Sequence, residues 1–250
     1  MNDAPDAPNV PASPPLLKAI AARRSLRAFA DRPVSDDLLR IMFEAVRWAP
    51  SSGNGQPWRF VVTRKGSEAH ARLAATLRSG NAWATRAPVL MLAAVKTVHD
   101  SPGKPVRANR RALLDLGLGL ENLLLQASAE GLVGHPMAGF DADAASLATG
   151  VEGEHQVAVM VALGYPGDPS TLDDETRAKD LRERRRDRQD AFVFLDAWGA
   201  PAPWAAQVRA EPAGDDARQG AGTSPDGRSR PDGGSSPDGG PTPAAEPESS

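Results

Sequence analysis

The sequence predicts an α+β sandwich in which helices cover a mixed sheet of few strands. Helical and extended patterns alternate along the central part of the chain. The run VLMLAAV at 89–95 is continuously apolar, and QVAVMVAL at 156–163 is apolar after its first residue, which is typical of strands buried on both faces. Apolar residues also cover much of the circumference of a predicted helix at 108–130. We expect that helix in the centre of the fold or at a subunit interface.

The other elements have signals at their ends. A first helix follows Pro15, because proline is tolerated at a helix start. Ser35 is a suitable N-cap for a second helix, which Pro50 ends. Residues 58–63 are rich in β-forming side chains and residues 67–78 have a helical pattern. A short strand and one more helix then precede the last apolar strand.

Composition divides the 250 residues into three parts. Residues 16–200 hold 25 Lys and Arg against 22 Asp and Glu, a net charge of +3, and form the predicted domain. The arm at 1–15 and the tail at 201–250 are acidic and rich in proline, and the tail repeats a PDG motif. Such segments bury too little apolar surface to offset their ordering entropy, so we expect both to be disordered.

The composition also excludes several classes of protein. The chain has no cysteine, which rules out a disulfide scaffold, a zinc ribbon and a cysteine nucleophile. No stretch approaches the roughly 18 apolar residues of a membrane span, and residues 1–15 lack the pattern of a secretory signal. We therefore expect a cytoplasmic protein with no membrane partner.

Packing does not explain three polar segments. RRSLRAF at 23–29 places three arginines and a hydroxyl within five residues, which suits a phosphate monoester, although arginines at a helix end also pair with the helix dipole. APSSGNGQPW at 49–58 offers many donors and acceptors, as a polar heterocycle or ribityl chain requires. GLVGHPMAGF at 131–140 has three glycines that permit close approach to a flat ligand, or form a simple connection.

With the helix DLGLGLENLLLQASAEGL and the ALGYP turn, these segments resemble the FMN-dependent nitroreductase family in order and spacing across about residues 14–196. The resemblance implies a three-layer α/β/α sandwich and an intertwined homodimer with FMN at the interface. It also implies the cofactor contacts. Those from one chain are Arg23, Arg24, Ser25 and Arg27 near the phosphate, ribityl and pyrimidine, and Pro136, Met137, Ala138 and Gly139 beside the ring, with the Ala138 amide near flavin N5. Those from the partner are Pro50, Ser51, Ser52 and Asn54.

The family also closes a late basic pair on the phosphate, and the resemblance places it at Arg186 and Arg188 in the cluster RERRRDR. A nucleic-acid patch is the alternative interpretation, but the cluster lacks aromatic residues for base stacking. The resemblance implies ping-pong turnover, in which NADH or NADPH reduces FMN and a nitroaromatic, quinone or similar acceptor oxidises it. The flavin supplies the chemistry, so no catalytic side chain and no metal are expected.

Two alternatives for the function remain open. One is a specialised member of the family, such as an enal or semialdehyde reductase, a dehalogenase or a flavin-dependent oxidase. The other is a flavin-binding regulatory protein without turnover. Acceptor choice is expected to depend on residues 96–111, where Lys104, Arg107, Arg110 and Arg111 suit an anionic acceptor or the 2′-phosphate of NADPH, or form a solvated loop.

Overall fold

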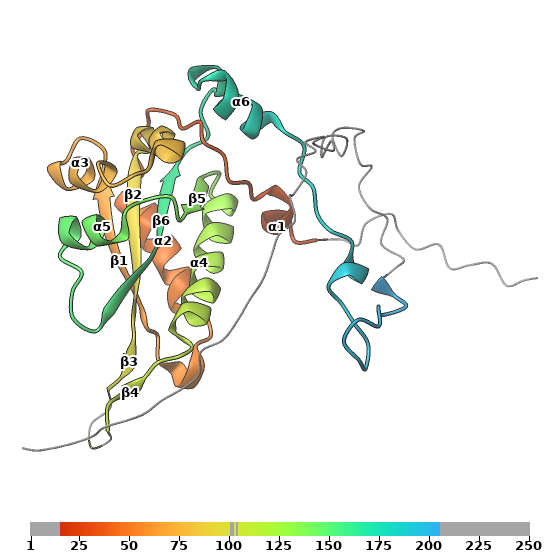
Figure 1. The fold of residues 1–250 in the computed structure, drawn as a ribbon. Helices are drawn as coiled ribbons and strands as arrows, with labels where there is room; N and C mark the ends of the chain where they lie inside the picture. Colours follow the sequence, from red (N-terminus) through yellow and green to blue (C-terminus); the bar gives the residue numbers. More distant parts are fainter. Residues whose placement is uncertain (1–15, 101–102, 104, 206–250) are drawn as a thin grey trace, which may run out of the picture. The chain divides into compact units, whose positions relative to one another are not determined.

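A computed structural model describes residues 16–100, 103 and 105–205 of the chain. Figure 1 shows the order of the elements. The helices are α1 (Lys18–Ala22), α2 (Asp36–Arg47), α3 (Glu68–Ala74), α4 (Ala112–Ala129), α5 (Ala142–Thr149) and α6 (Asp174–Leu181). The strands are β1 (Trp58–Arg64), β2 (Val89–Lys96), β3 (Val98–His99), β4 (Arg107–Ala108), β5 (Val133–Met137) and β6 (His155–Gly164). Short 3-10 turns are η1 (Ser52–Asn54), η2 (Ser79–Arg86), η3 (Pro169–Thr171) and η4 (Gln189–Ala191).

Side-chain caps fix where several helices begin. The Ser35 side chain accepts a hydrogen bond from the backbone N–H of Leu38, which confirms the predicted N-cap of α2. Asp141 and Asp173 cap α5 and α6 in the same way. These bonds satisfy backbone donors that have no partner within the helix.

The main sheet has the strand order β1-β2-β6-β5, and all three pairings are antiparallel. The prediction of a mixed sheet is therefore wrong for the described residues. Arg64, the last residue of β1, lies opposite Val89, the first of β2. The connection through α3 and η2 therefore brings the chain back to the edge of the sheet where β1 ends, and β2 runs in the opposite direction. An apolar run predicts a buried strand but carries no information about its direction, which is why the sequence did not reveal this.

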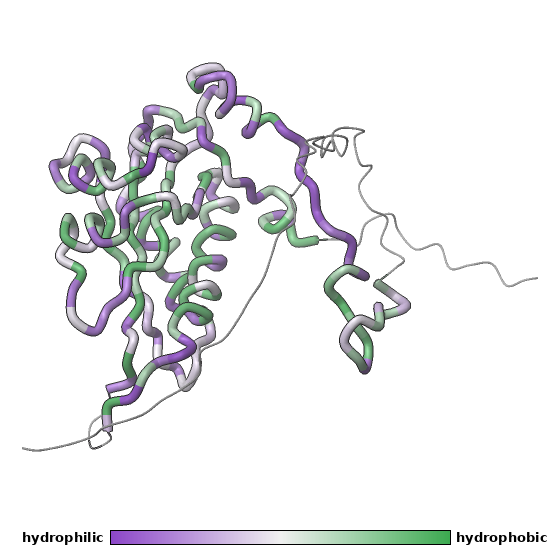
Figure 2. Tube along the Cα trace, in the orientation of Figure 1, coloured by the Kyte–Doolittle hydropathy of each residue, from purple (hydrophilic) through white to green (hydrophobic). Residues whose placement is uncertain are grey.

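The two central strands contribute alternate residues to two hydrophobic cores. Leu90 and Leu92 of β2 pack with α3, η2 and α5 on one face of the sheet. Val89 and Met91 pack with α2 and α4 on the other face. Successive side chains of a strand point to opposite faces, so this alternation produces the expected α/β/α layers. Figure 2 shows the same strands and α4 as mostly hydrophobic.

Three further details differ from the sequence prediction. Helix α4 begins at Ala112 rather than at residue 108, because Arg107–Ala108 pairs with β3 as a short hairpin. Helix α6 was not predicted, because Asp174–Leu181 has few apolar residues to mark a buried face. The predicted arm at 1–15 and residues 206–250 of the predicted tail lie outside the described residues, whereas residues 201–205 of that tail are described.

No helix in the part of the chain that the structure describes is both long and apolar enough to cross a bilayer.

Candidate functional site

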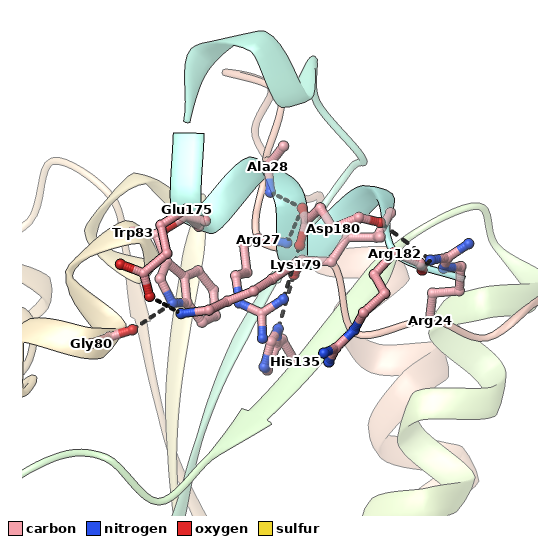
Figure 3. A network of polar contacts seen from close by, with 12 residues as sticks. Arg24, Arg27, Ala28, Gly80, Trp83, His135, Glu175, Lys179, Asp180 and Arg182 are labelled. Carbon is pink, nitrogen blue, oxygen red and sulfur yellow. Dashed lines mark hydrogen bonds and ion pairs between the residues drawn. The ribbon is translucent and has the colours of Figure 1, made fainter. Parts of the chain in front are cut away.

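The basic segment at 23–28 runs between α1 and α2, and Asp180 at the end of α6 holds it in place (Figure 3). One carboxylate oxygen, Oδ2, accepts hydrogen bonds from the backbone N–H groups of Arg27 at 2.7 Å and Ala28 at 3.0 Å. The other, Oδ1, accepts one from Arg27 Nη1 at 3.0 Å. The Asp180 side chain is only 1% exposed, so this is a buried and well-paired charge.

Two more arginines join the segment to the chain that follows α6. Arg24 Nη2 donates to the backbone oxygens of Asp180 at 3.2 Å and Arg182 at 3.1 Å. Arg184 donates in return to the backbone oxygens of Arg23 at 3.0 Å and Ala21 at 2.7 Å. The guanidinium groups in this region therefore outnumber its carboxylates, which suits a strongly anionic ligand.

Arg23 is the arginine of the segment that makes the weakest contacts. Its Nη1 lies 3.4 Å from Ser25 Oγ, and its Nε lies 3.9 Å from the exposed Glu121 carboxylate. Arg24 and Arg27 already use donors to fix the backbone, whereas Arg23 retains donors for a ligand. A half-buried guanidinium beside a hydroxyl fits a phosphate monoester, so the donor set supports the predicted cofactor contact.

Strand β5 brings the third predicted segment to the first. His135 Nδ1 lies 3.0 Å from the backbone oxygen of Leu26, and its ring centroid lies 4.5 Å from that of Trp83. The Arg27 guanidinium lies 5.8 Å from the Trp83 ring centroid. Burial, with a further contribution from the charge of Arg27, lowers the pKa of His135 below its ordinary value. A neutral His135 donates to Leu26 through Nδ1–H.

The loop after β5 exposes one backbone donor. Ala138 is exposed, and its N–H has no acceptor among the described residues. The neighbouring Gly139 oxygen accepts hydrogen bonds from Arg78 N and Asn81 Nδ2, both at 3.0 Å. A Cβ on Gly139 would lie 2.3 Å from Asn81 Nδ2, so glycine is needed for this contact. The loop is therefore fixed while the Ala138 N–H stays available, as the resemblance predicts for a donor to flavin N5.

The second predicted segment is a strained loop beside the start of α4. Ser52 N donates to Asp115 Oδ1 at 3.1 Å, and Gln56 N donates to Ser51 Oγ at 3.1 Å. Asn54 and Gln56 have φ of 54° and 43°, a region that non-glycine residues rarely adopt. The buried Asp115 Oδ2 has no hydrogen-bond partner among the described residues. Strain and an unsatisfied buried acceptor both occur preferentially at functional sites.

These segments do not form one site within a single chain. Ser52 is hydrogen-bonded to Asp115 in the first turn of α4, whereas Arg23 lies beside Glu121 of the same helix. Asp115 and Glu121 are about 9 Å apart along the helix axis. Figure 1 shows residues 50–55 near the start of α4 and β5 near its end. The structure thus groups residues 23–27 with 135–139 and 180–184, and it leaves residues 50–54 apart.

In the late basic cluster, the two arginines predicted to bind the phosphate have contacts with nearby residues. Arg186 donates to the Arg185 backbone oxygen, and Arg188 forms an ion pair with Asp190 at 2.8 Å. Arg182 and Arg184 are the cluster members that have contacts with residues 21–24. The assignment of the phosphate contact to Arg186 and Arg188 stays a prediction.

Sequence reasoning missed three residues of these regions. The Asp173 N-cap and the charge pattern of α6 were two signals for the helix that carries Asp180. The partner of Asp180, Arg27, is 153 residues away in the sequence. Asp115 is the first residue of the quoted helix motif DLGLGLENLLLQASAEGL but was given no role, and Trp83 lies in no quoted motif. No group of three or more potential metal ligands occurs within the described ranges.

A family model described as the nitroreductase family matches residues 20–82 and 75–165. The chain belongs to the nitroreductase family. It is 32% identical over 189 residues to a protein of Thermus thermophilus named NADH dehydrogenase, covering 62% of this chain and 89% of that one. It is 34% identical over 151 residues to an uncharacterized 15.4 kDa protein of Mycolicibacterium smegmatis, covering 57% of this chain and 99% of that one.

A solved structure described as an oxidoreductase containing FMN has the same fold. It aligns with a TM-score of 0.70 at 28% sequence identity, covering 74% of this chain and 94% of that one. The family model matches no residue after 165, so it does not reach α6 or Asp180.

Proposed function

We propose that this nitroreductase-family protein is an FMN-dependent oxidoreductase that uses NADH or NADPH to reduce a small acceptor by ping-pong turnover. When bound, FMN would supply the redox chemistry, which is transfer of a hydride through N5 from NADH or NADPH to a nitroaromatic, a quinone or a similar compound. The observation that carries the proposal is the fixed cationic segment at 23–27, with Arg23 donors still available. The exposed N–H of Ala138 follows three residues after His135, which contacts this segment at Leu26.

Each residue of the segment has a distinct part in holding the cofactor. Arg23 and Ser25 bind the phosphate, with Arg24 in the surrounding positive field. Arg27 anchors the segment through Asp180, and this carboxylate offsets part of the positive charge that Arg27 would present to the flavin pyrimidine. The Ala138 N–H orients the ring edge, and the Gly139 carbonyl keeps the loop in position.

A second copy of the chain is needed to complete this site. Helix α4 exposes Leu113, Leu114 and Leu118, and Leu17 before α1 and Ile20 within it are also exposed. Exposed leucines on one helix are an apolar patch that a subunit interface would bury. A homodimer through this face would bring residues 50–54 of one copy to residues 23–27 of the other, so that Pro50, Ser51, Ser52 and Asn54 line the same cofactor.

The experiment is flavin retention by Arg23→Ala. Arg23 is chosen because its side chain makes only weak contacts, whereas loss of Arg27 would leave the buried Asp180 unpaired. Loss of a charge-assisted contact costs about 1.5–3 kcal/mol, so we expect FMN to bind at least about tenfold more weakly in a fluorescence titration. Reduction of the bound flavin by NADPH and its reoxidation by a quinone are followed by absorbance.

Arg40→Ala is the matched control, because Arg40 is an exposed arginine of α2 whose partner is the nearby Asp37. The control should bind FMN like the parent protein, and both variants should have the parent's sedimentation coefficient. A parent protein that takes up no FMN would contradict the proposed function. Normal FMN affinity in Arg23→Ala would contradict the placement of the phosphate.

A further inference from the structure

A cationic groove lies between the η1 loop and the β3–β4 hairpin, away from the Arg23 segment. Two adjoining pockets share Ser52, His99 and Arg107 as lining residues. Arg110 and Arg111 line one of them, and Lys96 lines the other. We call these six residues the cationic groove.

The three arginines of the groove are not matched by carboxylates, although Asp100 also lines the pocket that contains Lys96. None of Arg107, Arg110 and Arg111 forms an ion pair within residues 16–100, 103 and 105–205. Lys96 lies within 4 Å of carboxylate oxygens of Asp100, at 3.9 Å, and Glu154, at 3.7 Å. Like charges brought together without counter-ions repel one another, and an anionic ligand would relieve that repulsion.

The backbone of the groove is well defined. His99 lies opposite Arg107 in the β3–β4 pairing, and its ring lies close to Gly55 of the loop after η1. The buried Asn109 donates through its backbone N–H to Thr97 O at 2.6 Å and accepts from Arg111 N at 3.2 Å. The three arginines therefore project from a hairpin and a helix start that are fixed by hydrogen bonds.

The geometry points to the 2′-phosphate of NADPH as the anion, and we infer that the enzyme prefers NADPH to NADH. This inference rests on the proposed function, which places Ser52 beside the flavin. A nicotinamide over the flavin must extend its adenosine end outward, and Ser52 also lines the cationic groove. A phosphate monoester has three oxygens and about two negative charges, which guanidinium forks bind well, whereas the 2′-hydroxyl of NADH offers neither.

The test compares binding of adenosine 2′,5′-bisphosphate with binding of 5′-AMP by calorimetry, using the full chain. The variant is Arg107→Ala with Arg110→Ala, and Arg40→Ala with Arg72→Ala is the control, since it removes the same charge from α2 and α3. We expect the bisphosphate to bind at least about tenfold more weakly to the variant, because two charge-assisted contacts are lost. Binding of 5′-AMP should change less than about twofold. The kcat/KM for NADPH should fall by a similar factor while that for NADH is retained.

The outcomes separate the groove from the flavin site. Equal binding of the two nucleotides by the parent, or equal losses in variant and control, would overturn the inference. A variant that keeps its NADPH preference but has a higher KM for an anionic acceptor would also overturn it, because the groove would then bind that acceptor. A chain that binds the bisphosphate more tightly than 5′-AMP but takes up no FMN would refute the proposed function and would not refute the anion site in the groove.

Discussion

Replacing Asp180 tests whether one buried carboxylate organises the cationic segment. Asp180→Ala removes the acceptor of the Arg27 and Ala28 backbone N–H groups and the partner of the Arg27 guanidinium. The segment then has no other described carboxylate to hold its backbone. We expect lower stability and weaker FMN binding together, since these bonds hold Arg27 and Ala28, which lie in the same segment as Arg23.

The magnitude follows from burial. Removing one partner of a buried ion pair costs about 3–5 kcal/mol, and each buried N–H left without an acceptor costs about 1–3 kcal/mol. These costs overlap, and Arg27 is 24% exposed and can be partly rehydrated, so about 3 kcal/mol is expected. For a domain of this size about 3 kcal/mol lowers Tm by about 6–12 °C.

Thermal and urea unfolding followed by circular dichroism measure the loss. Asp174→Ala is the matched control, because it removes an exposed aspartate of the same helix that pairs with Arg177. That pair should contribute less than about 1 kcal/mol. If Asp180→Ala is no less stable than Asp174→Ala, the view that Asp180 anchors the segment is refuted.

Two further predictions concern pH and close packing. Burial lowers the pKa of His135, so the unfolded chain binds a proton more readily and stability should fall as pH drops below about 6.5. His135→Gln should flatten that dependence in urea titrations. An unchanged slope in His135→Gln would contradict this. A Cβ on Gly167 would lie 2.4 Å from the backbone carbon of Phe29, so Gly167→Ala should lose at least about 1–3 kcal/mol in thermal unfolding, whereas Gly80→Ala, which meets nothing within 4 Å, should not. Equal Tm values for the two glycine variants would show that the backbone contact is not rigid.

Much of the fold could be predicted because its signals are local. Ser35 and the apolar spacing after it define α2, and the uninterrupted run at 89–95 defines β2. Strand direction is not local, since it depends on where the connection from Arg64 returns to the sheet. Helix α6 was missed because it has a cap and charges but little apolar surface.

The candidate site was predictable in its motifs and not in its contacts. The three polar segments could be singled out because packing alone does not explain RRSLRAF, APSSGNGQPW or PMAGF. The partners that hold them are distant in sequence, as Asp180 is from Arg27 and Asp115 is from Ser52. A sequence pattern cannot show that α4 separates two of these segments within one chain.

The central strands have a consequence for how the domain unfolds. Because β2 and β6 supply side chains to both hydrophobic cores, loss of either helical layer would expose apolar surface on the same two strands. Both helical layers therefore depend on packing against β2 and β6, and they are expected to unfold together as one cooperative unit. A substitution under α5 would be expected to weaken α2 as well, even though the sheet lies between them.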